Sequence, residues 1–120
     1  MVPSSITILC VDDEETPRIL RKLILQKQGY QVLTAASGVE ALEVLDRANI
    51  NLVLSDQMMP GMTGTELTKS VKAMRPTMPV ILLVKSNDNF SRNDLNPMTS
   101  SFFRRTAGPL IFLSDRVRRR

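Results

Sequence analysis

Residues 51–64, NLVLSDQMMPGMTG, carry the clearest indication of the fold of this chain. Its apolar run at residues 52–54 stops abruptly at Ser55 and Asp56, and a proline and two glycines then mark a loop. A short apolar run between turn-forming residues is typical of a buried strand in a parallel sheet. The strand therefore delivers one acid, Asp56, to the carboxyl edge of the sheet, where open α/β sheets bind their ligands.

A second group of acids follows the first apolar run of the chain. Residues 6–11, ITILCV, predict a strand, and residues 12–15, DDEE, come directly after it. If the two strands are parallel neighbours, Asp12, Asp13 and Asp56 converge within a few ångströms, and their charges require a compensating cation. Oxygen ligands without His or Cys nearby favour Mg²⁺. The alternative is that residues 12–15 only favour the start of the helix that follows them, without a metal. That interpretation does not explain why another strand ends in Asp56.

The first 84 residues alternate strands with helices. Further strands are predicted at residues 31–35 and 80–84, and helices are predicted to open near Pro17, at Ser37 and after Gly64. Apolar residues recur at helical spacing in three groups: Ile19, Leu20, Leu23 and Ile24; the inward-facing Ala41, Leu42, Leu45 and Ala48; and Leu67, Val71 and Met74. The alternation predicts βαβ units, hence an α/β fold with a parallel sheet and helices on both faces.

Three segments of this sequence resemble the receiver domain of bacterial two-component response regulators: VDDEE at residues 11–15, SDQMMPGMTG at 55–64 and RPTMPVILL at 75–83. The resemblance implies a flavodoxin-like, doubly wound parallel sheet with strand order 2-1-3-4-5. It covers roughly residues 5–84, so we place the domain core at residues 1–84, with four strands and three helices.

The resemblance also implies a function, a signalling role rather than enzymatic turnover. Asp56 would be the phosphoacceptor, forming an aspartyl phosphate in a phosphorelay with a histidine kinase or phosphotransfer protein. Mg²⁺ would be held by Asp13, Asp56 and the backbone carbonyl of Met58, and Asp12 would act through metal-bound water. A response regulator of this kind is cytoplasmic, and the apolar N-terminal run is too short for a signal peptide or membrane span.

The family pattern fails after residue 84. Val84 occupies the position where the family has Thr or Ser, with Ser86 as a weak substitute, and no Lys-Pro pair follows. The best candidate for a partial fifth strand is residues 110–113, where Ser114 would stand in place of the lysine. The alternative function is therefore a pseudo-receiver, which acts as a protein-interaction module without switching.

The composition also changes at this point. Residues 1–84 carry eight Lys/Arg and nine Asp/Glu, whereas residues 85–120 carry eight Lys/Arg and three Asp/Glu, so the basic character belongs to the tail. A frame change or true divergence would each explain this segment. We expect residues 85–120 to be irregular or incomplete and to leave one edge and one face of the sheet uncovered.

Two other interpretations of the sequence are weaker. The tail arginines would bind nucleic acid only nonspecifically, and no recognition motif accompanies them: Arg104, Arg105, Arg116, Arg118, Arg119 and Arg120. The single cysteine, Cys10, is predicted to be a buried strand residue rather than a reactive thiol. A homodimer stays open as an alternative, because the sequence does not specify the oligomeric state.

Overall fold

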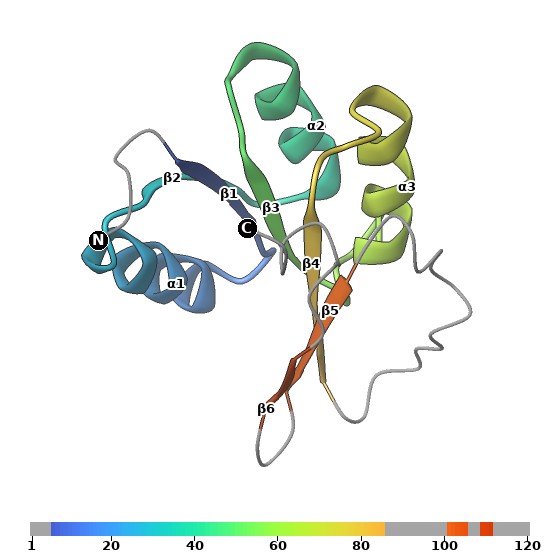
Figure 1. Cartoon of the computed structure of the whole chain (residues 1–120). Coiled ribbons are helices and arrows are strands. Elements are labelled where there is room, and N and C mark those ends of the chain that lie inside the picture. The colour runs from blue at the N-terminus through green and yellow to red at the C-terminus, as the bar shows by residue number, and fades with distance from the viewer. Residues whose placement is uncertain (1–5, 86–100, 106–108, 112–120) are drawn as a thin grey trace.

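The computed structural model describes residues 6–85, 101–105 and 109–111. Within these ranges strands and helices alternate up to residue 85, and two further strands follow (Figure 1). In chain order the elements are β1 (Thr7–Val11), α1 (Glu15–Lys27), β2 (Gln31–Ala35), α2 (Gly38–Arg47), β3 (Leu52–Asp56), α3 (Gly64–Met74), β4 (Val80–Lys85), β5 (Ser101–Arg105) and β6 (Pro109–Ile111).

The strands form one sheet with the order β2-β1-β3-β4-β5-β6. All pairings from β2 to β5 are parallel, and β6 pairs antiparallel with β5. The predicted order 2-1-3-4 is therefore confirmed. Val11 lies opposite Ser55 in the β1–β3 register, so the residues that follow these two strands emerge side by side at one edge of the sheet.

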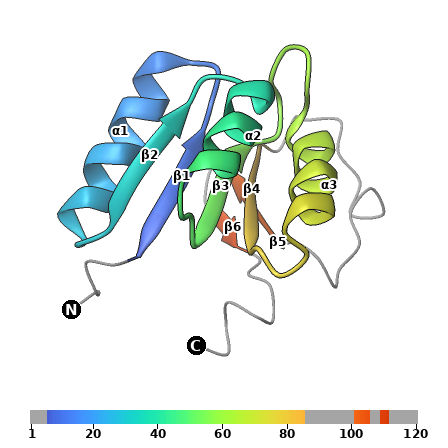
Figure 2. The ribbon, with the colours of Figure 1, turned by 90° about the horizontal axis from the view of Figure 1, so that it is seen from above.

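Helices cover both faces of the sheet, as the alternating pattern predicts. The strands lie between α1 on one side and the pair α2 and α3 on the other (Figures 1 and 2). Beneath α2 and α3 lies the larger apolar core, whose members include Leu9, Val53, Leu67 and Leu82. On the α1 side, the buried core residues in the described part of the chain are Ile8, Cys10 and Val32, with Leu25 of α1 packed against them.

The three helices bury their apolar residues to very different extents. The predicted inward face of α2 is confirmed, because Ala41 and Leu45 are buried and Leu42 and Ala48 pack against the core. In α3, Leu67 and Val71 are buried, but Met74 is 42% exposed. In α1 the four residues at helical spacing are all exposed: Ile19 46%, Leu20 54%, Leu23 55% and Ile24 61%. The spacing identifies a helix there but not a face that packs on the sheet.

Local signals account for where the helices start and stop. Gly29 follows α1 with φ of 102°, a conformation that a side chain disfavours, so a glycine at this position ends the helix. Ser37 caps α2 by accepting a hydrogen bond from the Glu40 N–H at 3.1 Å. A complete capping box occurs at Thr63 and Glu66, which cap each other's backbone at the start of α3.

The fifth strand differs from the sequence prediction. The segment that pairs parallel with β4 is β5 at Ser101–Arg105, and residues 110 and 111 belong instead to β6, which pairs antiparallel with β5. The edge of β4 that we expected to be open is therefore paired. The polar segment before β5 obscured this strand, although Phe102 and Phe103 have high strand propensity. Ser86, residues 112 and 113, and Ser114 lie outside the described residues.

Candidate functional site

The acids after β1 and at the end of β3 come together at the carboxyl edge of the sheet. One carboxylate oxygen each from Asp12, Asp13 and Asp56 lies within 4.8 Å of the others. The cause is topological, because β1 and β3 are adjacent parallel strands that end at the same level. The convergence expected from the sequence is therefore present.

The three acids differ in their exposure to solvent. Asp12 is 1% and Asp56 4% exposed, whereas Asp13 is exposed. Carboxylates this close together repel one another, and burial of two of them strengthens the repulsion. An all-oxygen set with one ligand open to solvent fits a hard divalent cation such as Mg²⁺, which keeps several of its waters. The donor chemistry of the pocket therefore fits the metal that the sequence indicates.

Helix α1 supplies two arginines that contact Asp12. Arg21 forms an ion pair with the Asp12 Oδ2 through Nη1, and Arg18 donates a hydrogen bond to the Asp12 carbonyl at 2.9 Å. The other carboxylate oxygen, Oδ1, accepts from the Glu14 N–H at 2.9 Å. Sequence reasoning missed both arginines. The signal was their spacing, because residues three apart on a helix that follows the acid pair share one face.

Hydrogen bonds of the Gln57 backbone and side chain hold the start of the loop after Asp56. The Gln57 N–H lies 3.1 Å from Asp56 Oδ1 and 3.0 Å from the Leu83 carbonyl oxygen. The Gln57 carbonyl accepts from the Gly64 N–H at 2.8 Å, and its side-chain Oε1 accepts from the Thr65 hydroxyl at 2.9 Å. The start of α3 is therefore tied directly to the end of β3.

Gly64 permits this close approach because it has no side chain. A Cβ at this position would lie 2.6 Å from the Asp56 carbonyl oxygen and 2.9 Å from the Gln57 Cα. Contacts that short with backbone atoms force the chain to move. Met58, whose carbonyl the family resemblance makes a metal ligand, lies in the same loop, and its side chain is 49% exposed.

Val84 lies in the core beneath α2 and α3, at 1% exposure. It follows Leu83, which pairs with Asp56 in the β3–β4 register, so it lies one residue beyond the partner of Asp56 on the neighbouring strand. An isopropyl group in this position has no hydroxyl to donate to an anion. The strand end beside Asp56 is therefore apolar at the position where the resemblance implies Thr or Ser.

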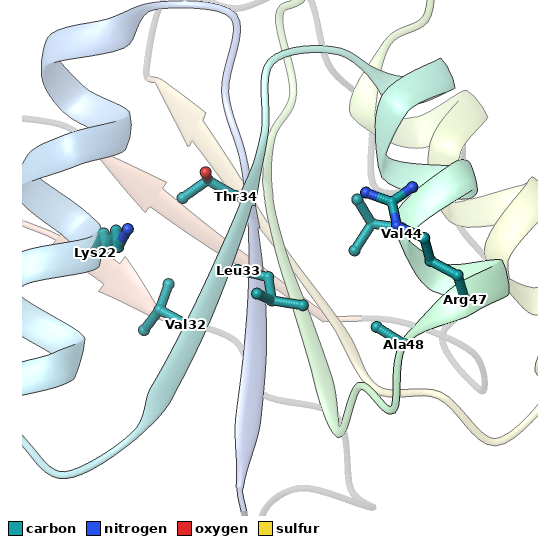
Figure 3. A pocket seen from close by; sticks show the side chains of 7 residues that line it. All are labelled: Lys22, Val32, Leu33, Thr34, Val44, Arg47 and Ala48. Atoms are coloured by element: carbon teal, nitrogen blue, oxygen red, sulfur yellow. The ribbon is translucent and has the colours of Figure 1, made fainter.

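A separate pocket of about 290 Å³ lies at the free edge of β2. Its lining comes from α1, β2 and α2: Lys22, Val32, Leu33, Thr34, Val44, Arg47 and Ala48 (Figure 3). Asp12, Asp13 and Asp56 do not contribute to this lining. The edge pocket and the acid pocket are therefore distinct places on the molecule.

Comparison with known proteins identifies the family. The sequence profile of the response regulator receiver domain matches residues 8–96, which is most of the chain. This chain belongs to the response regulator receiver family. Receiver domains are signalling modules, and the acid pocket of this one lies where parallel-sheet proteins bind their ligands.

Receiver relatives of several kinds resemble this chain. The transcriptional regulatory protein GlrR of Escherichia coli is 43% identical over 76 residues, which are 63% of this chain and 17% of GlrR. Sporulation initiation phosphotransferase F of Bacillus subtilis is 40% identical over 76 residues, covering 63% of this chain and 61% of the relative. The sensor kinase CckA of Brucella abortus is 38% identical over 92 residues, 74% of this chain and 10% of CckA.

Solved receiver structures share the fold. The response regulator TrrA of Thermotoga maritima, solved in complex with Mg²⁺-BeF, has a TM-score of 0.71 at 35% identity and covers 81% of this chain and 83% of TrrA. The chemotaxis protein CheY4 of Vibrio cholerae has a TM-score of 0.70 at 33% identity, with 74% and 76% of the two chains covered. None of the helices in the described residues is long and apolar enough to cross a membrane.

Proposed function

We propose that this receiver domain accepts a phosphoryl group on Asp56 from a histidine kinase or a phosphotransfer protein, with Mg²⁺ as the cofactor. The observation that carries the proposal is the convergence of Asp12, Asp13 and Asp56 at the carboxyl edge of the sheet. Asp56 is the last residue of β3, so its side chain is anchored by a strand while the loop beyond it opens toward a partner. The cytoplasm, where two-component partners meet, is the location that we propose with it.

The chemistry follows from a carboxylate acting as nucleophile. A carboxylate oxygen of Asp56 attacks the phosphorus of a phosphohistidine, an O–P bond forms, the P–N bond breaks, and the imidazole leaves with the electron pair. The product is an aspartyl phosphate. The hydrogen bond from the Gln57 N–H to Asp56 Oδ1 fixes the orientation of the carboxylate before the transfer.

Mg²⁺, when bound, neutralises negative charge on the transferring group and on the acids around it. The residues that would hold it are Asp13, Asp56 and the backbone carbonyl of Met58, with Asp12 acting through water. Asp13 is the exposed member of the acid set, so it is the one that solvent and an incoming ion reach first. TrrA, a structural neighbour, is known in complex with Mg²⁺-BeF, and this supports the assignment.

Intact mass spectrometry after incubation with acetyl phosphate and Mg²⁺ tests the acceptor. We expect one phosphoryl group on the wild type and none on Asp56→Asn. Asp46→Asn is the matched control, because Asp46 is an exposed acid of α2 outside the pocket, and it should label like the wild type. Labelling of the Asp56→Asn variant at the wild-type level would assign the acceptor to another residue.

Val84 favours a second candidate, the pseudo-receiver that binds a partner without switching. Its buried isopropyl group offers no hydrogen bond to an aspartyl phosphate, so phosphorylation would lack one contact able to pull the β4 end toward the site. Hydrogen exchange of the wild type with and without phosphodonor distinguishes the two. Unchanged exchange on a fully labelled protein would favour the pseudo-receiver, and altered exchange around β4 would favour the switching domain.

A further inference from the structure

The ion pair between Arg21 and Asp12 places a cation of the chain itself inside the acid pocket. Asp12 is 1% and Arg21 14% exposed at the side chain, so the pair is largely withdrawn from solvent. Arg21 Nη1 binds Asp12 Oδ2, and the Glu14 N–H occupies Oδ1. Both carboxylate oxygens of Asp12 therefore carry a donor from the protein before any metal enters.

The charge balance of the pocket changes accordingly. The Arg21 guanidinium adds one positive charge beside the three carboxylates, so its removal would make the pocket more negative by one charge. Because charges a few ångströms apart in a partly buried site interact strongly, this difference acts directly on the affinity for a cation.

Stability alone does not account for an arginine at this position. Arg21 Nη2 is buried and has no hydrogen-bond partner within the described residues, which is a cost that an apolar side chain would not carry. Replacing a buried ion pair by apolar side chains of similar size is often neutral or stabilising. The remaining explanation for an arginine at position 21 is that its guanidinium binds the Asp12 carboxylate and so limits the interaction of Asp12 with a metal ion.

We infer that Arg21 is a positioning residue that withholds Asp12 from the metal and so weakens the binding of divalent cations at this receiver site. This inference rests on the proposed Mg²⁺ site. Arg21 holds Asp12 in place when no metal is bound, and it competes for Asp12 Oδ2 with the metal and its bound water. Metal binding is left chiefly to Asp13 and Asp56, and the pocket fills only at a higher metal concentration than three free carboxylates would need.

Calorimetric titration with Mg²⁺ tests the inference on the purified full chain. Arg21→Met removes the charge while keeping an unbranched side chain, and we expect it to bind Mg²⁺ about tenfold more tightly than the wild type. Lys22→Met is the matched control, since it removes a positive charge from the next residue of α1. Lys22 lines the pocket at the edge of β2 and forms no hydrogen bond or ion pair within the described part of the chain. Its affinity should stay within about twofold of the wild type.

A double variant separates competition at Asp12 from a general charge effect. Arg21→Met combined with Asp12→Asn should lose the gain in affinity, because no carboxylate is released to the metal. Arg21→Gln serves if Arg21→Met does not fold, since glutamine removes the charge but still donates a hydrogen bond to Asp12. Thermal unfolding with and without Mg²⁺ provides a second measurement, and the metal-induced rise in melting temperature should be larger for Arg21→Met and Arg21→Gln than for the wild type.

Each other outcome has a definite meaning. Unchanged or weaker Mg²⁺ binding by the folded Arg21 variants overturns the inference and leaves the proposed function standing. A gain that persists in the double variant also overturns it, because Asp12 is then not the group through which Arg21 acts. If neither the wild type nor any folded variant binds Mg²⁺, the metal site fails, and the inference fails with it.

Discussion

The two faces of the sheet are held by different kinds of interaction. Among the residues whose burial the structure describes, the face beneath α2 and α3 carries a core of fifteen buried residues, whereas the face beneath α1 has three. No residue of α1 is classed as buried, and its larger aliphatic side chains are exposed. Helix α1 is instead attached by the contacts of Arg18 and Arg21 with Asp12 and by Leu25. One face is thus stabilised by apolar burial, and the other depends on polar contacts that converge on the functional site.

This difference links the stability of α1 to the chemistry of the acid pocket. A change in the charge on Asp12 alters its ion pair with Arg21 and so alters the attachment of α1 to the sheet. It leaves the apolar core beneath α2 and α3 unchanged. Apolar burial is not directional, so α2 and α3 tolerate small shifts, but a buried ion pair is sensitive to the loss of either partner.

Truncation of a leucine on each face should give the largest contrast. Leu67→Ala in α3 removes a fully buried side chain, and we expect a loss of about 2–5 kcal/mol in the free energy of unfolding. Leu23→Ala in α1 changes a side chain that is 55% exposed, so its effect should stay within about 0.5 kcal/mol. Urea denaturation of both variants makes the comparison. Losses of equal size would show that the outer face of α1 is covered in solution.

Cys10 reports on the α1 face through the pH dependence of stability. Burial is the main cause that raises the pKa of the Cys10 thiol from 9.0 to about 11, with nearby Asp12 adding to the rise and Arg21 opposing it. The unfolded chain therefore loses this proton at lower pH than the folded one. The stabilisation is fully present below about pH 9 and is lost as pH rises toward 11, and it amounts to about 3 kcal/mol at most.

The measurement is the difference between the wild type and Cys10→Ala across this pH range, because other groups titrate there in both proteins. The stability of the wild type should fall more steeply above pH 9 than that of Cys10→Ala. Parallel curves would mean that the thiol under α1 is accessible to water. Slow alkylation of native Cys10 at pH 8, with fast alkylation in urea, is the corresponding kinetic result.

Gly64 tests how tightly the start of α3 is joined to the end of β3. Gly64→Ala places a methyl group against the backbone of Asp56 and Gln57, and we expect a loss of about 1–3 kcal/mol in stability. Gly38→Ala is the matched control, because a Cβ there meets only the flexible side chain of Met62, which is able to move. Gly38→Ala should therefore cost clearly less. An equal loss of stability in both variants would show that the backbone at the start of α3 moves as easily as the Met62 side chain.

Much of the fold was predictable because its signals are local. The apolar run before Asp56, the acids after residue 11 and the prolines and glycines between the elements fix where strands end, and the alternation of elements then implies the parallel order. The three acids could be brought together from sequence for the same reason. Adjacent parallel strands deliver the residues at their carboxyl ends to one edge, whatever the detailed packing.

Other features were not predictable because they depend on partners distant in the sequence. The spacing of Ile19, Leu20, Leu23 and Ile24 identifies a helix, but whether that face meets the sheet depends on how the helix docks. The fifth strand is another case, since residues 101–105 become a strand by pairing with β4 rather than by a periodic pattern of their own. Strand pairing of this kind is decided between segments, not within one.

Short-range patterns of apolar residues and turn formers are enough to predict the parallel α/β sheet, the acid at the end of β3 and the acid pair after β1. The pairing of Arg21 with Asp12, the approach of Gly64 to the backbone of Asp56 and the exposure of most aliphatic side chains of α1 follow only from the packing of the folded domain. The physical reason is that a one-dimensional pattern specifies which residues share a face. The neighbour that each face meets is chosen by the packing of the whole domain.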